Sequence, residues 1–294
     1  MDVSIIYVNY NIYNLLTNSI QSVIELTADI SYEILIVDNN SQPEEKLKLQ
    51  QFCTSHKITL IESDTNLGFG KANNLAAKHA KGKYLFFLNP DTYLINNAIK
   101  ELYLFSINNN ITTCGANLFS KEEKPIHSYW MKMPSISFEL SALFSDIPLK
   151  IKHHNSHEHN YTNQPKEVAF ITGATLMIQH SLFKNIGGFD PDYFMYFEET
   201  DLQLRIKHTG NKIYNLPTAK IIHLESQSLK SRVQKLKLFF TSRKIFYSKN
   251  CTKTEFTIAN TILKFSCIIR IFAFTILQNK EKSNYWKTIL NQCL

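Results

Sequence analysis

A run of five apolar residues that ends in asparagine, proline and aspartate constrains the fold of this chain more than any other feature. The run, residues 84–88, has the length and aromatic content of a buried strand. Pro90 cannot continue a β-ladder, so the strand ends near Asn89, and Asp91 follows at once. An acid at the carboxyl end of a buried strand lies where open α/β sheets bind their ligands. The run therefore predicts an α/β sheet with a ligand-binding edge.

Strand-like and helix-like segments alternate through the first half of the chain. This order is typical of βαβ units and predicts an α/β fold, with a mostly parallel sheet flanked by helices. The expected strands are residues 3–8, 33–37, 58–62, 83–88 and 111–118, and the expected helices are residues 13–26, 44–56, 70–79 and 98–107. Further along, we expect a strand at 168–178, a helix at 198–208 and short strands at 212–215 and 219–223.

Residues 120–166 interrupt this alternation. They contain four prolines and a polar tract with four histidines between residues 153 and 160. We interpret the stretch as a long insertion, such as a lid or a loop that faces the acceptor. The histidines lack a fixed ligand geometry, so the tract is interpreted as a solvated polar loop in preference to a metal site.

The composition indicates a globular protein of a reducing compartment. The chain has 294 residues, of which 44% are hydrophobic, enough for a sizeable core. Its five cysteines are scattered, odd in number and without CxxC spacing, which argues against a disulfide framework or a zinc site. Residues 3–8 are too short an apolar run for a signal sequence. We therefore expect a cytoplasmic protein.

The positive charge of the chain is concentrated in its tail. Residues 229–294 carry thirteen Lys or Arg and two Glu, whereas residues 1–228 have a net charge of −4. Apolar residues in the tail recur at helical spacing: Ile258, Ile262, Phe265, Ile269, Phe272 and Ile276. Lys264 and Arg270 interrupt the run, so it makes a poor membrane span. A basic helix with an apolar face suits the surface of an anionic membrane; the alternative is a helix packed on the catalytic domain.

Polar residues that follow the predicted strands are candidates for binding a nucleotide. Asp38 ends the second strand, where a carboxylate can accept a hydrogen bond from a base or a ribose. The turn at 66–74 opens a helix whose free N–H groups can face phosphate or sugar, although it lacks the GxGxxG pattern of dinucleotide folds. Alone, an aspartate after a strand is as often a plain turn residue. The candidate binding residues are Val8, Tyr10, Asp38, Asn66, Gly68, Asn73, Asn89 and Asp91.

Asp91 and His223 are the candidate ligands of a divalent metal. A nucleoside diphosphate that leaves a sugar builds up negative charge, which a cation bridging its phosphates stabilises. Oxygen ligands suit Mg2+ or Mn2+, and Mn2+ also accepts imidazole. The alternative for His223, at the end of a late apolar strand, is a buried histidine hydrogen-bonded to the backbone.

Three acids in the first turn of the helix at 198–208 are candidates for a general base. Glu198, Glu199 and Asp201 lie where the helix dipole favours negative charge. A carboxylate near an acceptor hydroxyl can remove its proton. The alternative is that the acids only stabilise the start of the helix, and Asp201 can pair with Arg205 four residues on.

Together these motifs resemble family 2 glycosyltransferases with the GT-A fold, and most of all the rhamnosyltransferase-like group of bacterial surface-polysaccharide enzymes. The resemblance covers about residues 2–228 and consists of VNYN at 8–11, VDNNS at 37–41, NLGF at 66–69, LNPD at 88–91 and YFEETDL at 196–202. It implies an inverting transfer from a nucleotide-activated sugar with a divalent metal. It also implies that Asp38 contacts the nucleotide base and that Glu199 is the catalytic base. Asp91 would be the last acid of the DxD metal motif, and His223 would ligate the metal.

Two positions depart from the family pattern. Asn89 replaces the first acid of DxD, as is common in this group, so the metal has one carboxylate fewer. The base position holds Glu199 where the family usually has aspartate, and the extra methylene moves the carboxylate by about one bond length. Glu198 is therefore a second candidate, which would share or take over the proton transfer.

We therefore expect a GT-A-like, Rossmann-like domain over residues 1–228, with the insertion at 120–166, and a basic helical region over 229–294. The expected activity is inverting transfer of a sugar, with rhamnose favoured, from a nucleotide-sugar to a glycan or lipid-linked acceptor, with Mn2+ or Mg2+. The expected place is the inner face of the cell membrane, as a peripheral protein with no nucleic-acid partner. Two alternatives stay open: a sugar-phosphate nucleotidyltransferase, and a non-catalytic nucleotide-sugar-binding module at the membrane.

Overall fold

The computed structural model describes residues 1–145, 158–224 and 232–292 of the chain. These residues divide into two units, each with its own packing. The first unit lies within Met1–Met131, His154–Phe194 and Glu198–Ser228 and contains the strands. The second lies within Lys132–His153, Met195–Phe197 and Leu229–Leu294 and is helical.

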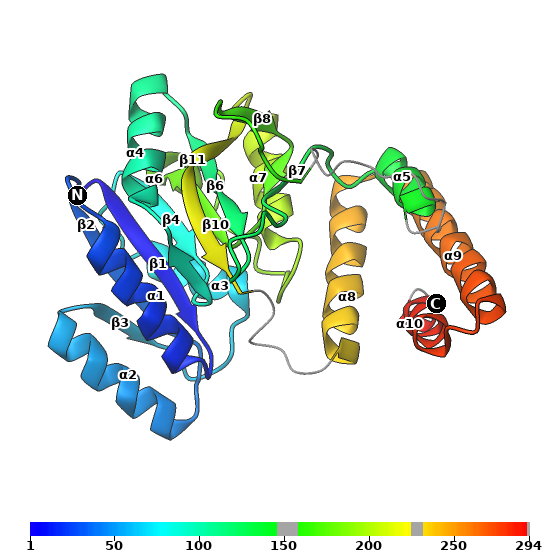
Figure 1. Ribbon diagram of the computed structural model, residues 1–294, viewed down its shortest axis with the longest axis horizontal. Coiled ribbons are helices and arrows are strands. Elements are labelled where there is room, and N and C mark those ends of the chain that lie inside the picture. Colours follow the sequence, from blue (N-terminus) through cyan, green and yellow to red (C-terminus); the bar gives the residue numbers. More distant parts are fainter. Residues whose placement is uncertain (146–157, 225–231, 293–294) are drawn as a thin grey trace. The chain divides into compact units, whose positions relative to one another are not determined.

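A mixed nine-stranded sheet forms the centre of the first unit (Figure 1). Its order is β3-β2-β1-β4-β10-β6-β11-β5, and β8 pairs with β11. Strands β3, β2, β1 and β4 are parallel, and β10 runs antiparallel between β4 and β6. The strands are β1 Val3–Asn9, β2 Tyr32–Asp38, β3 Thr59–Glu62, β4 Tyr84–Leu88, β5 Thr92–Leu94, β6 Thr113–Phe119, β8 Lys166–Val168, β10 Thr175–Gln179 and β11 Ile213–His223. A separate pair joins β7 Tyr129–Trp130 to β9 Phe170–Ile171.

Helices cover both faces of the sheet and create two apolar cores. On one face, alternate residues of β1 and β4 pack with α1 Tyr13–Leu26, α2 Pro43–His56 and α4 Ala98–Asn109. On the other, the intervening strand residues pack with α3 Phe69–Ala77, α6 His180–Asn185 and α7 Glu198–His208. Because strand side chains alternate between faces, a strand buried on both sides must be apolar throughout, as β4 is. This three-layer arrangement confirms the predicted α/β fold class.

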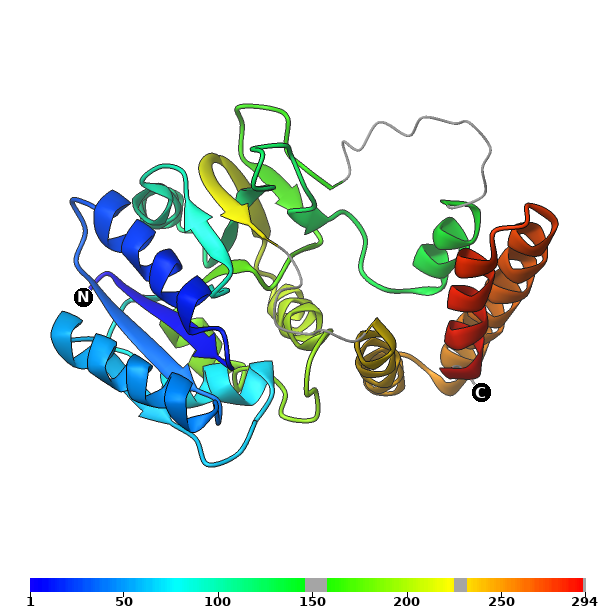
Figure 2. The ribbon, with the colours of Figure 1, turned by 60° about the horizontal axis from the view of Figure 1, so that its bottom comes forward.

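The helical unit is built from segments far apart in the sequence. Its helices are α5 Ile136–Ser145, α8 Arg232–Asn250, α9 Lys253–Ile276 and α10 Lys280–Gln292, and α10 runs alongside α9 (Figure 2). A capping box begins α9: Thr252 Oγ1 accepts from the backbone of Glu255, whose carboxylate accepts from Thr252 N at 2.8 Å. Met195–Phe197 belong to this unit, and Ser242 Oγ donates to Met195 O at 2.7 Å.

Two predicted strand boundaries are wrong for reasons the structure makes plain. The expected strand at 168–178 is three short strands, β8, β9 and β10, because the chain leaves the main sheet after Val168, pairs with β7 as β9, and returns to the main sheet at Thr175. The two expected strands at 212–215 and 219–223 are one strand, β11, which keeps pairing with β6 across an irregularity between Leu216 and Lys220. The predicted helix at 198–208 is confirmed with both its bounds.

Candidate functional site

The carboxyl ends of β1 and β2 hold Asp38 in one orientation. Asn9 and Asp38 are register partners at the last position of their strands, and both side chains are buried. Asp38 Oδ1 accepts from Asn9 Nδ2 at 3.0 Å, and Asp38 Oδ2 accepts from the backbone N–H of Ser41 at 3.1 Å. A buried carboxylate fixed on two sides is pre-organised to receive a further donor, such as a base N–H.

A loop that opens α3 is tied to the residue after Asp38. Asn39 Nδ2 donates to Asn66 Oδ1 at 3.0 Å, and Asn39 Oδ1 accepts from Leu67 N at 2.8 Å. Gly68 precedes α3 with a φ of 77°, and a Cβ there would lie 2.2 Å from the carbonyl oxygen of Phe194. Only glycine permits this conformation and this close backbone approach. The predicted residues Asp38, Asn66 and Gly68 thus lie along one edge of the sheet.

Asp91 and His223 are brought together by the pairing of β5 with β11. His223 is the register partner of Thr92, which follows Asp91 in the chain. His223 Nε2 lies 3.3 Å from Asp91 Oδ1, and both side chains are mostly buried. The backbone N–H of Leu224 donates to Asp91 O at 3.0 Å, which fixes the two chain segments to each other. Residues 132 apart in sequence therefore meet at the carboxyl edge next to β4.

This pair fits a divalent cation that also binds phosphate. A carboxylate and an imidazole nitrogen are donors that Mn2+ accepts together. In the part of the chain that the structure describes, no group of three His, Cys, Asp or Glu side chains could hold a metal. A site with two protein ligands suits a metal that takes its remaining ligands from substrate phosphates and water.

Glu198 and Glu199 begin α7, and burial raises the pKa of both. Glu198 is buried and its pKa is raised well above the ordinary value by desolvation and by the neighbouring Glu199. Desolvation raises the pKa of Glu199 to about 7, against backbone hydrogen bonds that lower it. The more exposed Glu199 thus titrates near neutrality. Because the two carboxyl groups are neighbours, ionisation of one disfavours ionisation of the other.

The loop between β9 and β10 packs against Glu199, and the sequence alone did not single it out. A Cβ built on Gly173 would lie 3.5 Å from Glu199 Cγ. The same loop is joined to the end of β4, because Asn89 N donates to Ala174 O at 3.0 Å. Thr172 Oγ1 is buried and has no hydrogen-bond partner within the described residues. The one sequence signal for this loop is Gly173 within the triplet Thr-Gly-Ala at 172–174. The residues around it are apolar enough to predict one continuous strand.

Gln203 fixes α7 to this loop. Its amide donates to Ile171 O at 2.8 Å and accepts from Ile171 N at 2.8 Å. This bidentate contact spans a sequence distance of 32 residues and replaces a missing ladder partner of β9. The contact fixes where α7 lies relative to the end of β9. It therefore also fixes the position of Glu199, which lies one helical turn before Gln203.

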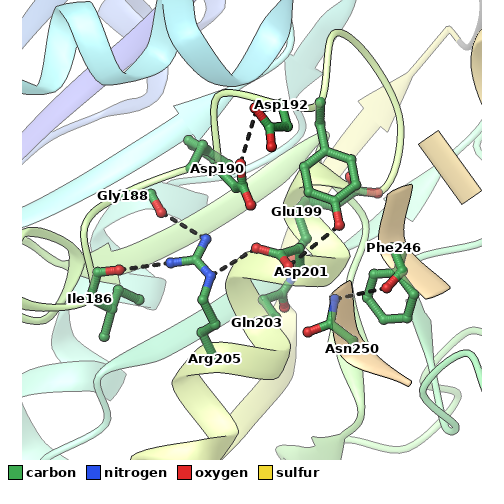
Figure 3. Close-up of polar contacts among 12 residues, drawn as sticks. Ile186, Gly188, Asp190, Asp192, Glu199, Asp201, Gln203, Arg205, Phe246 and Asn250 are labelled. Carbon is green, nitrogen blue, oxygen red and sulfur yellow. Dashed lines mark hydrogen bonds and ion pairs between the residues drawn. The ribbon is translucent and has the colours of Figure 1, made fainter. Parts of the chain in front are cut away.

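Asp201 has the structural function that its spacing from Arg205 allows. Arg205 Nε lies 2.8 Å from Asp201 Oδ2, and its other nitrogens donate to the carbonyl oxygens of Ile186 and Gly188 (Figure 3). Tyr193 OH also donates to Asp201, at 3.4 Å. Each of the three guanidinium nitrogens thus makes one hydrogen bond, and these bonds hold Ile186 and Gly188 against α7.

The remaining predicted binding residues differ in how far their side chains are exposed. Val8 and Asn89 are half-buried at the ends of β1 and β4, whereas Tyr10 is exposed beyond β1. Asn73 is buried and donates to Phe69 O at 3.1 Å, so the structure does not bring its amide to the surface of the edge. Within the His-rich tract, residues 153–157 lie outside the described residues. His159, in contrast, is buried and hydrogen-bonded to Asn117 and to the backbone of Ile126, so the predicted solvated loop is wrong for this end of the tract.

Comparison with known proteins gives one family and several relatives. A sequence model of the family described as "Glycosyl transferase family 2" matches residues 4–187. The rhamnosyltransferase WbbL of Escherichia coli (strain K12) is 28% identical over 210 residues, which cover 66% of this chain and 74% of that protein. The Escherichia coli protein named UDP-Glc:alpha-D-GlcNAc-diphosphoundecaprenol beta-1,3-glucosyltransferase WfgD is 32% identical over 110 residues, 37% of this chain and 43% of that protein.

A solved structure shares the fold. The crystal structure of GalNAc-T7 with UDP, GalNAc and Mn2+ superposes with a TM-score of 0.63 and 17% sequence identity. The match covers 84% of this chain but only 47% of that one. At this identity the likeness concerns the arrangement of strands and helices.

Proposed function

The chain belongs to glycosyl transferase family 2 and has the GT-A fold, and on that premise we propose that it is an inverting, metal-dependent sugar transferase of polysaccharide synthesis. The observation that carries the proposal is that the candidate site residues lie at one edge of the sheet. Asp38 ends β2, Asp91 follows β4 and His223 ends β11. The loop that touches Glu199 leads into β10, which runs antiparallel to β4, so all of them lie at one edge of the sheet. Open α/β sheets bind ligands at that edge.

The donor would be a nucleoside diphosphate sugar whose base lies at Asp38. The carboxylate already accepts from Asn9 and Ser41, and its remaining lone pairs can accept from a base N–H. The backbone at the start of α3 is tied to the same edge through Asn39 and can face the sugar or the phosphates. These contacts orient the donor without any covalent chemistry.

Asp91 and His223 would hold the divalent metal, Mn2+ or Mg2+. When bound, the metal stabilises the negative charge that develops on the leaving diphosphate. The separation of 3.3 Å between Oδ1 and Nε2 shows that the two donors already face one another in this protein. Asn89, which replaces an acid, contributes its backbone N–H to the loop at Ala174.

Glu199 would act as the base in a single displacement. It takes the proton of an acceptor hydroxyl while the oxygen of that hydroxyl bonds to the anomeric carbon. The bond from that carbon to the diphosphate oxygen breaks on the opposite side, so the configuration inverts. A pKa of about 7 places Glu199 close to the optimum for proton transfer at neutral pH. The raised pKa of Glu198, due to burial and to Glu199, disfavours a second negative charge beside the base.

The sugar and the acceptor are proposed from the named relatives. WbbL is a rhamnosyltransferase, which favours rhamnose as the sugar transferred. The name of WfgD gives a diphosphoundecaprenol acceptor, which favours a lipid-linked acceptor here. Such an acceptor would place the enzyme in the cytoplasm at the inner face of the cell membrane.

A donor panel with a product analysis tests this function. Thermal shifts of the full chain would be measured with dTDP-, UDP- and GDP-sugars in the presence of Mn2+, and the best donor then offered to a lipid extract. We expect one nucleotide class to stabilise the protein, and NMR of the glycan to show an anomeric configuration opposite to that of the donor. A product that retains the donor configuration would refute the single displacement.

A further inference from the structure

One side of α9 exposes a continuous apolar strip. The strip residues are 41% to 68% exposed, which is unusual for large apolar side chains on one helix. They follow one another at spacings of seven, three, four and four residues, so they share one side of the helix. No charged residue lies between them on that side. The outer strip consists of Ile258, Phe265, Ile268, Phe272 and Ile276.

The covered side of the same helix holds two polar groups among its buried residues. Its buried residues include Ser266 and Arg270, and the guanidinium of Arg270 donates to Ser266 Oγ. The Arg270 guanidinium also lies over the ring of Trp286 in α10, 4.6 Å from the ring centre. A surface helix of a water-soluble domain turns its apolar side inward. In α9 both sides carry apolar residues: Ala259, Cys267 and Phe274 are buried together with Arg270, and the outer strip remains exposed.

The interior of the helical unit is complete without the outer strip. Arg243 is buried and bonds Glu139 Oε1 at 2.8 Å and Asn260 Oδ1 at 2.7 Å, which joins α5, α8 and α9. Tyr247 OH donates to the same carboxylate at 2.9 Å. Ile289 of α10 is buried as well. Among the described residues, these buried contacts are made without the outer strip, which stays exposed.

Charge identifies the partner as an anionic bilayer. Residues 229–294 have thirteen Lys or Arg against two Glu. On α9 itself, Lys253 and Lys264 lie eleven residues apart, three turns of helix, along one border of the outer strip. Lysines beside an apolar face bind anionic headgroups while the apolar side chains enter the acyl region. Two copies of so basic a surface would repel each other.

The helix would lie in the plane of the membrane. Among the described residues, α9 is the one helix long and apolar enough to cross a bilayer, with 24 residues and a mean hydropathy of 1.5 over an 18-residue window. Its inner side, however, carries Arg270 and packs along α5 and the polar α10. A spanning position would take those groups into the hydrocarbon, which is costly. Insertion of the outer strip alone leaves them on the aqueous side.

We propose that the outer strip of α9 is a membrane-docking surface that inserts in-plane into an anionic bilayer. Vesicle flotation of the full chain tests it, with vesicles of phosphatidylglycerol and phosphatidylcholine against phosphatidylcholine alone. The double variant Phe265→Ser/Phe272→Ser should bind the anionic vesicles about 100-fold more weakly, because two aromatic rings no longer enter the acyl region. Leu47→Ser is the matched control, an equally exposed apolar residue on α2, and should bind as the wild type does.

Further variants distinguish a membrane from a second copy of this chain as the partner of the outer strip. Lys253→Gln/Lys264→Gln should weaken binding to anionic vesicles several-fold and leave the thermal midpoint unchanged. Undiminished flotation of the double phenylalanine variant would overturn the proposal. A second outcome would also overturn it: the wild type is a dimer in light scattering and binds no vesicles, and the double variant is a monomer. The strip would then be an interface between copies. If the double variant lowers the thermal midpoint, Phe272→Ser alone is used. Nucleotide-sugar binding in solution should be unchanged, which separates this test from that of the proposed function.

Discussion

At the scale of single residues, the chemistry of the site depends on two adjacent glutamates with different surroundings. Glu198 is buried between α3 and α7, where a Cβ on Gly70 would lie 3.6 Å from its own Cβ. One of its carboxylate oxygens has no hydrogen-bond partner within the described residues. Glu199 faces the Gly173 loop. This difference in surroundings, which the sequence does not show, is the reason that we propose Glu199 and not Glu198 as the base.

The rate of sugar transfer should depend on the ionisation of Glu199. A base works only as the carboxylate, whose fraction falls as the pH drops below the pKa of about 7. We therefore expect kcat to level off above pH 7 and to fall about tenfold per pH unit well below it. Glu199→Gln should reduce kcat by about 100-fold to 10,000-fold. Glu198→Gln should keep the shape of the pH–rate profile; loss of the acidic limb in that variant would transfer the base function to Glu198.

Removal of the carboxylate of Asp91 should abolish the metal dependence of donor binding. Asp91→Asn keeps the size of the side chain and its backbone contact with Leu224 but weakens a hard cation ligand. In thermal-shift measurements with a nucleoside diphosphate, the extra stabilisation that Mn2+ gives the wild type should disappear. Asp29→Asn, an exposed partner of Lys100, is the control. Equal Mn2+ responses in Asp91→Asn and wild type would exclude Asp91 as a ligand.

At the scale of elements, turns were harder to predict than strands and helices. Apolar runs and helical spacing were sufficient for β1, β4, α1 and α7, because their signals are local. The β9–β10 loop was missed because Ile171 and Thr175 belong to different strands although only Thr172, Gly173 and Ala174 separate them. Its conformation depends on Gln203, 32 residues away, which no local pattern reveals.

Gly68→Ala tests whether close backbone packing at the start of α3 stabilises the loop at residues 66–68. The new methyl group would meet the carbonyl of Phe194 at 2.2 Å, in addition to the strain of a φ of 77°. Gly187→Ala is a matched control, because Gly187 has a φ of 82° and open space around it. We expect Gly187→Ala to cost about 1–3 kcal/mol of unfolding free energy and Gly68→Ala to cost clearly more, in urea unfolding. Equal costs would show that backbone strain alone matters at Gly68.

Some residues at the sheet edge could be predicted from the sequence alone. Asp38, Asp91 and His223 were proposed because each follows a predicted strand, and the strand ends do lie at one edge. Pairing of β11 with β5 could not be deduced from spacing, so the contact of His223 with Asp91 required the structure. Asn73 shows the opposite case, since a motif residue turned out to bond its own helix.

At the scale of the whole molecule, the middle of the insertion, with α5, belongs to the same helical unit as the tail, and the two ends of the insertion belong to the first unit. The sequence placed residues 120–166 in the catalytic domain, whereas α5, within that stretch, packs with α8 and α9. The buried contact between Glu139 and Arg243 joins positions 104 residues apart, which no periodicity predicts. The apolar spacing of α9 was visible in the sequence, but its outward orientation was not.

Arg243→Ala should destabilise the helical unit selectively. It leaves Glu139 buried without its charged partner, which typically costs about 3–5 kcal/mol. Hydrogen exchange should increase in α5, α8 and α9 and stay unchanged in β1 and β4. Lys244→Ala, at the exposed neighbouring position, should exchange as the wild type does. Uniform exchange changes in both units would show that they unfold together.

The most direct test of sugar transfer is the release of nucleoside diphosphate from the donor that binds best, with Mn2+ and a lipid extract as acceptor. Wild type, Glu199→Gln and Glu167→Gln would be compared, the last being an exposed glutamate that pairs with Lys212. We predict release by the wild type and Glu167→Gln, and loss of nearly all release in Glu199→Gln with its donor-induced thermal shift retained. Release by Glu199→Gln at the wild-type rate would contradict the assignment of the base and the mechanism built on it.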